Sequence, residues 1–208
     1  FTSCCPGWVR FIQSEYPQLT ARLSTAKSPQ QMFGAVAKTY FAEQLQVDPE
    51  RICCISVMPC VAKKGEAALP AMRVTDSGPD VDIVLTTREL IRLITGEYLV
   101  PELLTDQEFD SPLGESTGAG VIFGTTGGVM EAALRTAAYV LTGSNPPADG
   151  FAEVRGGAGR KEAVYHLNGV PVRTCTVSGL KNARLLMTDI CNQKAAYDFV
   201  EVMACPGG

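Results

Sequence analysis

Cysteine is the residue type through which this sequence can do chemistry. The 208 residues include eight cysteines but a single histidine. That balance disfavours a histidine-rich zinc or copper site, whereas thiolates are the usual ligands of iron–sulfur clusters. A zinc module built from thiolates alone also fits poorly, because the sequence lacks the Cys-x-x-Cys spacing of zinc knuckles. We therefore predict a reduced protein in which some of the thiols bind iron and sulfide.

Three of the cysteines stand where predicted elements begin or end. Cys60 and Cys205 each follow a predicted strand, and Cys5 precedes a predicted helix. The elements that they adjoin are a buried strand at 51–57, a strand at 197–203 and a helix at 7–19. Ligands gather at strand ends and helix starts in α/β proteins, and a helix N-terminus favours thiolate over thiol. These three thiols, from distant segments, can therefore converge at one site.

The rest of the sequence alternates helical and strand patterns. Ser28 as a cap and Pro29 at the first helical position predict a helix to about residue 45. Thr86 and Glu89 have the capping-box spacing for a helix through residue 94. Further predicted elements are a buried strand at 81–85, a loop at 106–120, a helix at 127–141, strands between 151 and 177 with a turn at Asn168-Gly169, and a helix at 178–191. The alternation predicts an α/β fold with mixed, partly parallel sheets flanked by helices.

Composition and charge argue against two classes of function. The formal net charge is −4 and the basic residues are scattered, so nothing favours nucleic acid as a partner. With 46% hydrophobic and 19% charged residues, and no sufficiently long apolar run, we expect no membrane segment. Both ends of the sequence lie inside cysteine-bearing motifs, so we expect a partial sequence, truncated at both ends.

Three segments of the sequence resemble the signature motifs of the [FeFe]-hydrogenases. They are Thr-Ser-Cys-Cys-Pro-Gly-Trp at 2–8, Met-Pro-Cys-Val-Ala-Lys-Lys-Gly-Glu at 58–66 and Glu-Val-Met-Ala-Cys-Pro-Gly-Gly at 201–208. They stand in the family's order with comparable separations, and the glycine-rich stretches at 118–124 and 127–132 also resemble that family. The resemblance spans residues 1–208 and implies a partial large subunit, from the C-terminal catalytic domain.

What the resemblance implies is an H-cluster. This cofactor is a [4Fe–4S] cubane joined through a cysteine to a two-iron unit with CO, cyanide and a dithiolate bridge. By motif position, Cys5, Cys60 and Cys205 match three of the four cubane ligands. The fourth ligand, which in the family also bridges to the two-iron unit, would be the residue after Gly208.

The resemblance also assigns roles to residues around the cluster. Cys4 matches a cysteine that relays protons, Ser24 a hydroxyl of the proton path, and Lys63 a lysine that hydrogen-bonds a cyanide. Glu66 can pair with Lys63 at helical i,i+3 spacing. The matched positions that line the cofactor are Met58, Met203, Ser28, Gln30 and Phe123.

Plain structural explanations compete with each of these roles. A free cysteine usually packs as a small hydrophobe, an isolated serine usually caps or faces solvent, and Lys63-Lys64 alone would indicate a solvated pair. We expect His166 to be structural, and we expect core packing for the cysteines outside the motifs, which are Cys53, Cys54, Cys175 and Cys191.

The activity implied by the resemblance is reversible H2 oxidation and proton reduction. Its expected partners are H2 and protons as substrates, ferredoxin or a similar electron carrier, and maturation proteins. The expected compartment is the cytoplasm, with the periplasm as the alternative. Two other interpretations stay open: a hydrogenase-like iron–sulfur assembly or scaffold protein without H2 chemistry, and a sensory hydrogenase. The presence of Cys4, Lys63 and Glu66 favours the enzyme.

Overall fold

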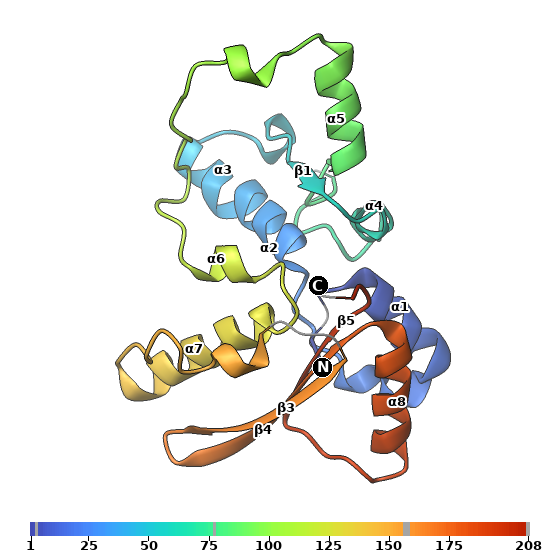
Figure 1. Cartoon of the computed structure of the whole chain (residues 1–208). Coiled ribbons are helices and arrows are strands. Elements are labelled where there is room, and N and C mark those ends of the chain that lie inside the picture. The colour runs from blue at the N-terminus through green and yellow to red at the C-terminus, as the bar shows by residue number, and fades with distance from the viewer. Residues whose placement is uncertain (3, 77, 156–158, 207–208) are drawn as a thin grey trace. The chain divides into compact units, whose positions relative to one another are not determined.

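The chain forms two compact units. The computed structural model describes residues 1–2, 4–76, 78–155 and 159–206. Unit 1 comprises Phe1–Thr25 and Ser116–Gly208, and unit 2 comprises Ala26–Glu115. Figure 1 follows both units along the chain by colour.

Unit 1 is built on a three-stranded mixed sheet of order β3-β4-β5. Strands β3 (Arg160–Leu167) and β4 (Val170–Ser178) are antiparallel, whereas β4 and β5 (Phe199–Met203) are parallel and joined through helix α8 (Leu180–Cys191). Asn168 and Gly169 turn the hairpin with φ of 49° and 81°, which confirms the predicted turn. The predicted helix at 178–191 is also confirmed. The segment at 151 begins instead with a short 3-10 turn, η5 (Ala152–Val154).

The predicted first helix is divided in two by a proline. Helix α1 (Pro6–Glu15) ends before Tyr16, whose φ of −137° and ψ of 57° are not helical. A separate 3-10 helix, η1 (Pro17–Arg22), follows. Proline clashes with a helical residue before it, so Pro17 excludes the uninterrupted helix predicted at 7–19. The cysteine-bearing start of the helix is unaffected.

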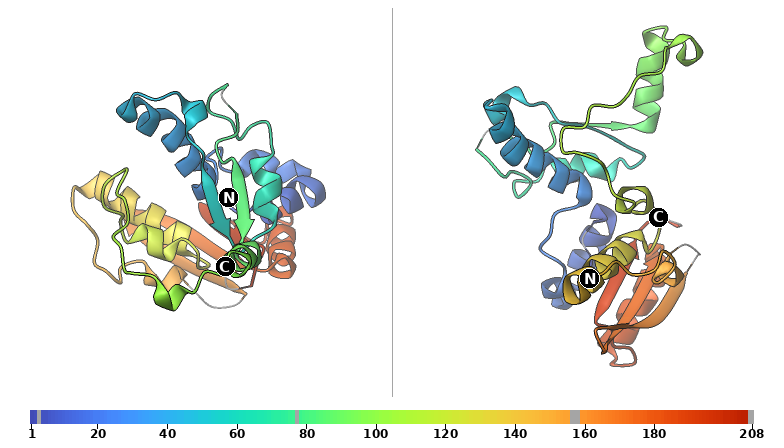
Figure 2. Two further views of the ribbon diagram at one scale, coloured as in Figure 1. Left: turned by 90° about the horizontal axis from the view of Figure 1, so that it is seen from above. Right: turned by 90° about the vertical axis from the view of Figure 1, so that its left-hand side faces the viewer.

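Both faces of the unit 1 sheet are covered by helices. Helices α1 and α8 pack on one face, and α7 (Gly128–Thr142) packs on the other (Figures 1 and 2). Successive residues of β5 alternate between them: Val200 and Val202 enter the first apolar cluster, and Phe199 packs against the second. A four-residue helix, α6 (Ala119–Ile122), precedes α7. Its first two residues lie in the segment at 106–120 that was predicted to be a loop.

Unit 2 contains a parallel pair of strands and several helices. Strands β1 (Ile55–Met58) and β2 (Ile83–Thr86) pair in parallel. The predicted helix at 29–45 forms as α2 (Pro29–Val36), a π-helical turn η2 (Ala37–Phe41) and α3 (Ala42–Leu45). The other elements are η3 (Pro49–Arg51), α4 (Ala62–Ala67), α5 (Thr87–Gly96) and η4 (Pro101–Leu103).

Strand β1 differs from the prediction of a buried strand. Ile55 and Val57 are 58% and 47% exposed. Parallel strands are buried on both faces only when helices cover both faces, and these side chains face solvent. In β2, Val84 is buried but Ile83 is 43% exposed, so that strand is buried only in part. The capping box of Thr86 and Glu89 at the start of α5 is confirmed.

Polar contacts hold α2 and its continuation to the segment at 79–82. The Lys38 ammonium lies 2.7 Å from an Asp82 carboxylate oxygen and donates to the Pro79 carbonyl at 2.7 Å. A Cβ at Gly34 would lie 2.3 Å from the Asp80 carbonyl oxygen, so only glycine allows this approach. Lys38 is itself buried, so the interior of unit 2 contains a charged side chain that the sequence pattern did not predict.

The cysteines outside the motifs divide into two groups. Cys54 and Cys175 are buried, as predicted, and burial raises the pKa of both thiols, that of Cys175 to about 11. Cys53 and Cys191 are exposed, so the prediction of core packing is wrong for them. His166 lies exposed on β3. Within the described ranges, no helix is both long enough and apolar enough to cross a bilayer.

Candidate metal centre

Unit 1 brings the first and third motifs together along β5. The backbone N–H of Thr2 donates to the Val200 carbonyl at 2.9 Å, so the start of the chain runs beside this strand. The indole Nε1 of Trp8 donates to the Thr2 carbonyl at 3.1 Å, which ties α1 to the same segment. Cys5 then occupies the extended position just before α1, where Pro6 begins the helix.

The thiols of the first motif lie against the residues of the third. Cys4 Sγ donates to Met203 Sδ at 3.9 Å, and the Ala204 N–H donates to Cys5 Sγ at 3.4 Å. A Cβ at Gly7 would lie only 3.2 Å from Ala204 Cβ, so the two motifs are closely packed. Hydrogen bonds to sulfur are also a feature of iron–sulfur clusters, whose potentials they help to set. Cys5 therefore stands in a position that suits a metal ligand.

The other predicted residues of unit 1 lie on the same elements or close to them. Cys205 follows β5 by two residues and is exposed. Ser24 is exposed after η1, and its backbone N–H donates to the Phe1 carbonyl at 2.8 Å. Phe123 follows α6 directly and is half-buried. Their roles stay predictions.

In unit 2, β1 and α4 present the second motif. Met58 ends β1, and Cys60 lies in the turn before α4 begins at Ala62. Strand, turn and helix thus carry a half-buried methionine and a half-buried cysteine. This is the predicted placement of Cys60 at the C-terminal end of a strand.

Lys63 takes part in a buried polar cluster within unit 2. Its Nζ lies 3.0 Å from Glu66 Oε2, and Ser28 Oγ donates to the same oxygen at 2.8 Å. Lys63 is 8% exposed and Glu66 is 5% exposed. The predicted i,i+3 pair is confirmed, and the alternative of a solvated Lys63 is wrong. Ser28 occupies the cap position of α2, but its hydroxyl makes no cap hydrogen bond there, because it donates to Glu66.

Gln30 has one amide atom satisfied and one that lacks a partner. Its Oε1 accepts from Ser56 Oγ at 2.7 Å, which joins α2 to β1. Its Nε2 is buried and has no hydrogen-bond partner among the described residues. A buried donor without a partner is costly, so this atom suits an acceptor that a cofactor would supply.

The thiols of the motifs suit iron and sulfide in their chemistry. Cys5 and Cys205 belong to unit 1 and Cys60 to unit 2. Cysteine sulfur, rather than histidine nitrogen, is the usual ligand of iron–sulfur clusters. Inside either unit, the described side chains include no trio of His, Cys, Asp or Glu arranged around one ion.

Glu201 is a residue of the third motif to which sequence reasoning gave no role. It is fully buried on β5, and its two carboxylate oxygens accept from the N–H groups of Gly127 and Met130, each at 2.7 Å. Burial raises the pKa of Glu201 above its ordinary value of 4.5, although these two hydrogen bonds oppose the rise. The available signal was a single carboxylate between two valines of a buried strand.

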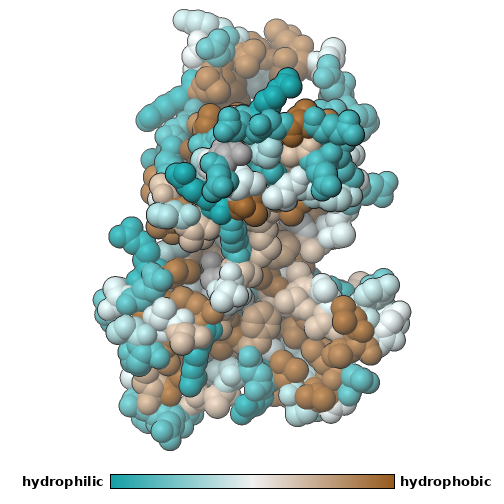
Figure 3. Space-filling view, turned by 180° about the vertical axis from the view of Figure 1, so that it is seen from behind, coloured by the Kyte–Doolittle hydropathy of each residue, from teal (hydrophilic) through white to brown (hydrophobic). Residues whose placement is uncertain are grey.

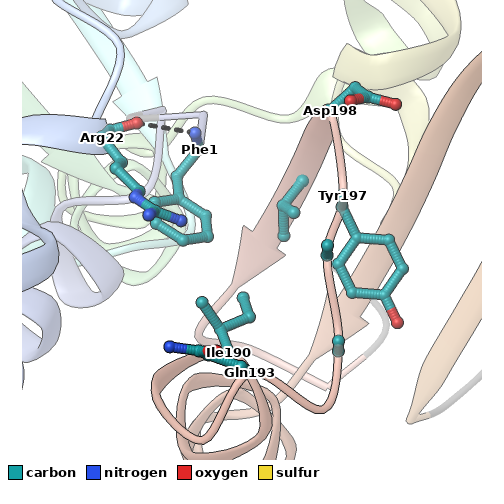
Figure 4. Close-up of a pocket in the computed structure, with 9 residues that line it drawn as sticks. Phe1, Arg22, Ile190, Gln193, Tyr197 and Asp198 are labelled. Carbon is teal, nitrogen blue, oxygen red and sulfur yellow. Dashed lines mark hydrogen bonds between the residues drawn. The ribbon is translucent and has the colours of Figure 1, made fainter.

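A pocket on unit 1 lies apart from these sulfur atoms. Figure 4 shows Phe1 and Arg22 on one side, Tyr197 and Asp198 on the other, and Ile190 and Gln193 below them. The Phe1 ammonium donates to the Arg22 carbonyl at 2.8 Å. The residues that line this pocket include no cysteine or methionine, so the pocket is not the candidate metal centre.

An α/β fold with thiolates at strand ends and a helix start defines a candidate iron–sulfur protein. Residues 1–208 match the family described as iron only hydrogenase large subunit, C-terminal domain. The chain belongs to this family. The hydrogenases of this family are oxidoreductases whose H-cluster contains iron–sulfur centres.

Two curated relatives are hydrogenase subunits. They are the NADP-reducing hydrogenase subunit HndD of Solidesulfovibrio fructosivorans, 49% identical over 207 residues, and the periplasmic [Fe] hydrogenase large subunit of Nitratidesulfovibrio vulgaris, 46% identical over 208 residues. Both alignments cover 100% of this chain but 35% and 49% of the relatives, so the chain spans a third to a half of their length.

A solved structure and a more distant relative extend the comparison. An apo form of the [FeFe]-hydrogenase HydA1 from Chlamydomonas reinhardtii matches with a TM-score of 0.80 at 36% identity, over 99% of this chain and 58% of that chain. The fold class predicted from the sequence is therefore confirmed. Cytosolic iron-sulfur assembly component 3 of Mus musculus is 31% identical over 211 residues, which cover 99% of this chain and 44% of that protein.

Proposed function

We propose that this chain is a catalytic part of an [FeFe]-hydrogenase, which oxidises H2 and reduces protons reversibly at an H-cluster. The observation that carries the proposal is the meeting of the first and third motifs in unit 1. Cys4 directs its thiol at Met203, and Cys5 lies against Ala204, although 199 residues separate the members of each pair. This contact supports a common site for the relay cysteine and a ligand cysteine.

Cys4 is the residue that we propose to carry protons. Its thiol is half-buried and lies next to Cys5, a proposed ligand, so it stands beside the place where a cluster would bind. A thiol can give and take a proton near neutral pH, provided that it lies beside the reacting atom. When bound, the H-cluster would supply the polarisation of H2 and the transfer of electrons. Ser24 is the proposed hydroxyl of the proton path.

The polar cluster of unit 2 is the proposed source of donors to anionic ligands of the cofactor. The Lys63 ammonium is buried and pairs with Glu66 Oε2, the same oxygen that accepts from the Ser28 hydroxyl, so the position of the ammonium is fixed. The buried Gln30 Nε2 is a second donor of the same kind. Both groups would fix the cofactor's orientation and tune its potential by hydrogen bonding.

The ligands in this proposal are Cys5, Cys60 and Cys205, as their motif positions imply. Met58, Met203 and Phe123 would pack around the cluster and exclude water from it. Electrons would be exchanged with ferredoxin or a similar carrier, and maturation proteins would install the two-iron unit.

The alternative is an iron–sulfur assembly protein without H2 chemistry. It is supported by the 31% identity to cytosolic iron-sulfur assembly component 3. The higher identity to hydrogenase subunits, 49% and 46%, and the presence of Cys4 favour the enzyme.

The test is Cys4→Ala in the complete encoded protein with its cofactor installed. We expect the iron content to be unchanged and H2 turnover to fall about 10³-fold, within the range lost with a general acid–base group. Cys191→Ala is the matched control, because Cys191 is an exposed thiol of unit 1 outside the motifs. It should leave both quantities unchanged.

Cys60→Ala separates ligation from proton relay. We expect this variant to lose iron, and an unchanged iron content would contradict the ligand role. Full H2 turnover in Cys4→Ala would contradict the relay role. A wild-type protein that binds iron and sulfide but neither makes nor consumes H2 would favour the assembly protein.

A further inference from the structure

Glu201 is a buried carboxylate on the strand that carries the third motif. It is 0% exposed. Alternate residues of a strand share a face, so Glu201 projects from the same face of β5 as Met203. Met203 in turn receives the Cys4 thiol. The carboxylate therefore lies two residues behind a side chain of the candidate metal centre, on the same side of the sheet.

The partners of Glu201 are at the start of α7. Gly127 precedes the helix and Met130 lies in its first turn, and each donates its N–H to a different oxygen of the carboxylate at 2.7 Å. The first N–H groups of a helix have no intrahelical acceptor, and the helix dipole is positive there. One side chain thus satisfies two backbone donors of a 15-residue helix from a neighbouring strand.

The chain before α7 is closely packed against neighbouring backbone. Gly127 has a φ of 85°, and a Cβ there would lie 1.9 Å from the Val154 carbonyl oxygen. A Cβ at Gly128 would lie 1.8 Å from the Ile122 carbonyl oxygen, next to Phe123. Glu201 therefore connects β5 to the turn that follows Phe123.

We propose that Glu201 is a positioning residue of the metal centre, which sets Met203 of β5, and Cys205 two residues beyond it, against the segment that carries Phe123. Its negative charge, fixed behind Met203, also lowers the reduction potential of the bound group. This inference rests on the proposed function for the identity of that group, an iron–sulfur cluster. The hydrogen bonds of Glu201 themselves do not depend on it.

The experiment compares Glu201→Gln with Glu131→Gln in the complete encoded protein. Glu131 is the matched control, because it is a buried carboxylate on α7, the helix that Glu201 contacts, but it pairs with Arg135 and Arg155. Each protein is reconstituted without oxygen using ferrous iron and sulfide. Iron retention against a chelator, the electron paramagnetic resonance spectrum of the reduced cluster and its reduction potential are then measured.

Glu201→Gln keeps the shape but loses the charge, and its Nε2 must face an N–H donor. We expect its affinity for iron to fall about tenfold, as when a group that supports a metal ligand is removed. Its spectrum should change, and its potential should become less negative. Glu131→Gln should match the wild type in retention, spectrum and potential.

Two outcomes would overturn the inference. One is wild-type iron retention and potential in Glu201→Gln, and the other is the same change in Glu131→Gln, which would indicate general loosening of α7. Wild-type protein that binds no iron and sulfide would instead overturn the proposed function. If Glu201→Gln does not fold, Glu201→Asp decides: it keeps the charge on a shorter side chain. We expect a wild-type potential with weaker iron retention, and full retention would overturn the positioning role.

Discussion

Units 1 and 2 bury different kinds of side chain. The two apolar clusters found among the described residues both belong to unit 1, centred on Trp8 and Val202 in one and Met130 in the other. The buried apolar residues of unit 2 are all small, such as Val81 and Val84, and they lie beside buried charged and amide groups, which include Gln31, Lys38, Lys63, Glu66 and Asp80. Apolar burial stabilises without regard to direction, whereas buried polar groups must be matched one by one. Unit 2 therefore depends on specific partners.

The surfaces of the two units differ in how many large apolar side chains they expose. Unit 2 exposes many large apolar side chains, among them Tyr98 at 91%, Leu103 at 79% and Phe109 at 97%. Figure 3 shows that hydrophobic residues, drawn in brown, reach the molecular surface in several places. The sequence of unit 2 is thus not poor in apolar residues; its fold leaves them outside.

Both units start a helix with a carboxylate, in opposite environments. In unit 2, Glu89 is a half-buried member of the capping box of α5, and hydrogen bonds from Thr86 and Lys64 lower its pKa to about 2. In unit 1, Glu201 reaches α7 from another strand, and burial raises its pKa. The same chemical role therefore gives opposite pKa shifts, because desolvation dominates only in the buried case.

The largest expected effect is the loss of an apolar anchor in unit 1. Trp8→Ala removes a fully buried side chain from the centre of a cluster, and we expect the free energy of unfolding to fall by about 3–5 kcal/mol. Urea unfolding of the metal-free protein measures it. Phe109→Ala in unit 2 is the control, expected to change stability by about 0.5 kcal/mol or less. Similar costs for both variants would contradict the comparison of the units.

A smaller effect is expected from a buried ion in unit 2. Lys38→Met leaves Asp82 and the Pro79 carbonyl without their donor. The Asp82 side chain is 27% exposed, so water replaces part of the interaction, and we expect a loss of about 2 kcal/mol in the free energy of unfolding. Arg173→Met in unit 1 breaks an ion pair to Asp198 whose side chains are 53% and 43% exposed. That control should cost about 0–1 kcal/mol in the same urea titration. Equal losses would show that burial of the pair does not matter.

The smallest effect, and the one that sharpens the comparison most, is the sign of the pH dependence. The folded pKa of Glu89 is depressed, so its contribution is present above pH 4.5 and is lost as the pH falls toward 2. The folded pKa of Glu201 is raised, so the folded state binds more protons, and stability falls as the pH rises above 4.5. For each carboxylate, the free energy of unfolding of the metal-free protein is measured against pH, from about 2 to above 4.5. The contribution of the carboxylate is the difference between the wild-type protein and Glu89→Gln or Glu201→Gln. Slopes of the same sign would contradict the assignment of desolvation to Glu201 alone.

Local features of the fold were predictable from the sequence. The capping box at Thr86, the turn at Asn168-Gly169 and the helix at 127–141 depend on neighbouring residues, and all three were predicted within one or two positions. The break of the first helix was also local, since Pro17 is visible in the sequence. It was missed because the apolar periodicity continues past the proline. The motifs likewise led to the family, because their residues and order stand in the sequence itself.

The sequence by itself determined the family, the class of fold and the thiols that can bind iron. Only the tertiary structure decided which polar groups are buried and with what partners. The Ser28 hydroxyl donates to Glu66 and does not cap α2, Cys53 is exposed where a buried strand was expected, and Glu201 reaches a helix that begins more than 70 residues earlier. The physical reason is that burial and hydrogen-bond partners depend on which segments meet in space, and no local pattern of residues specifies that.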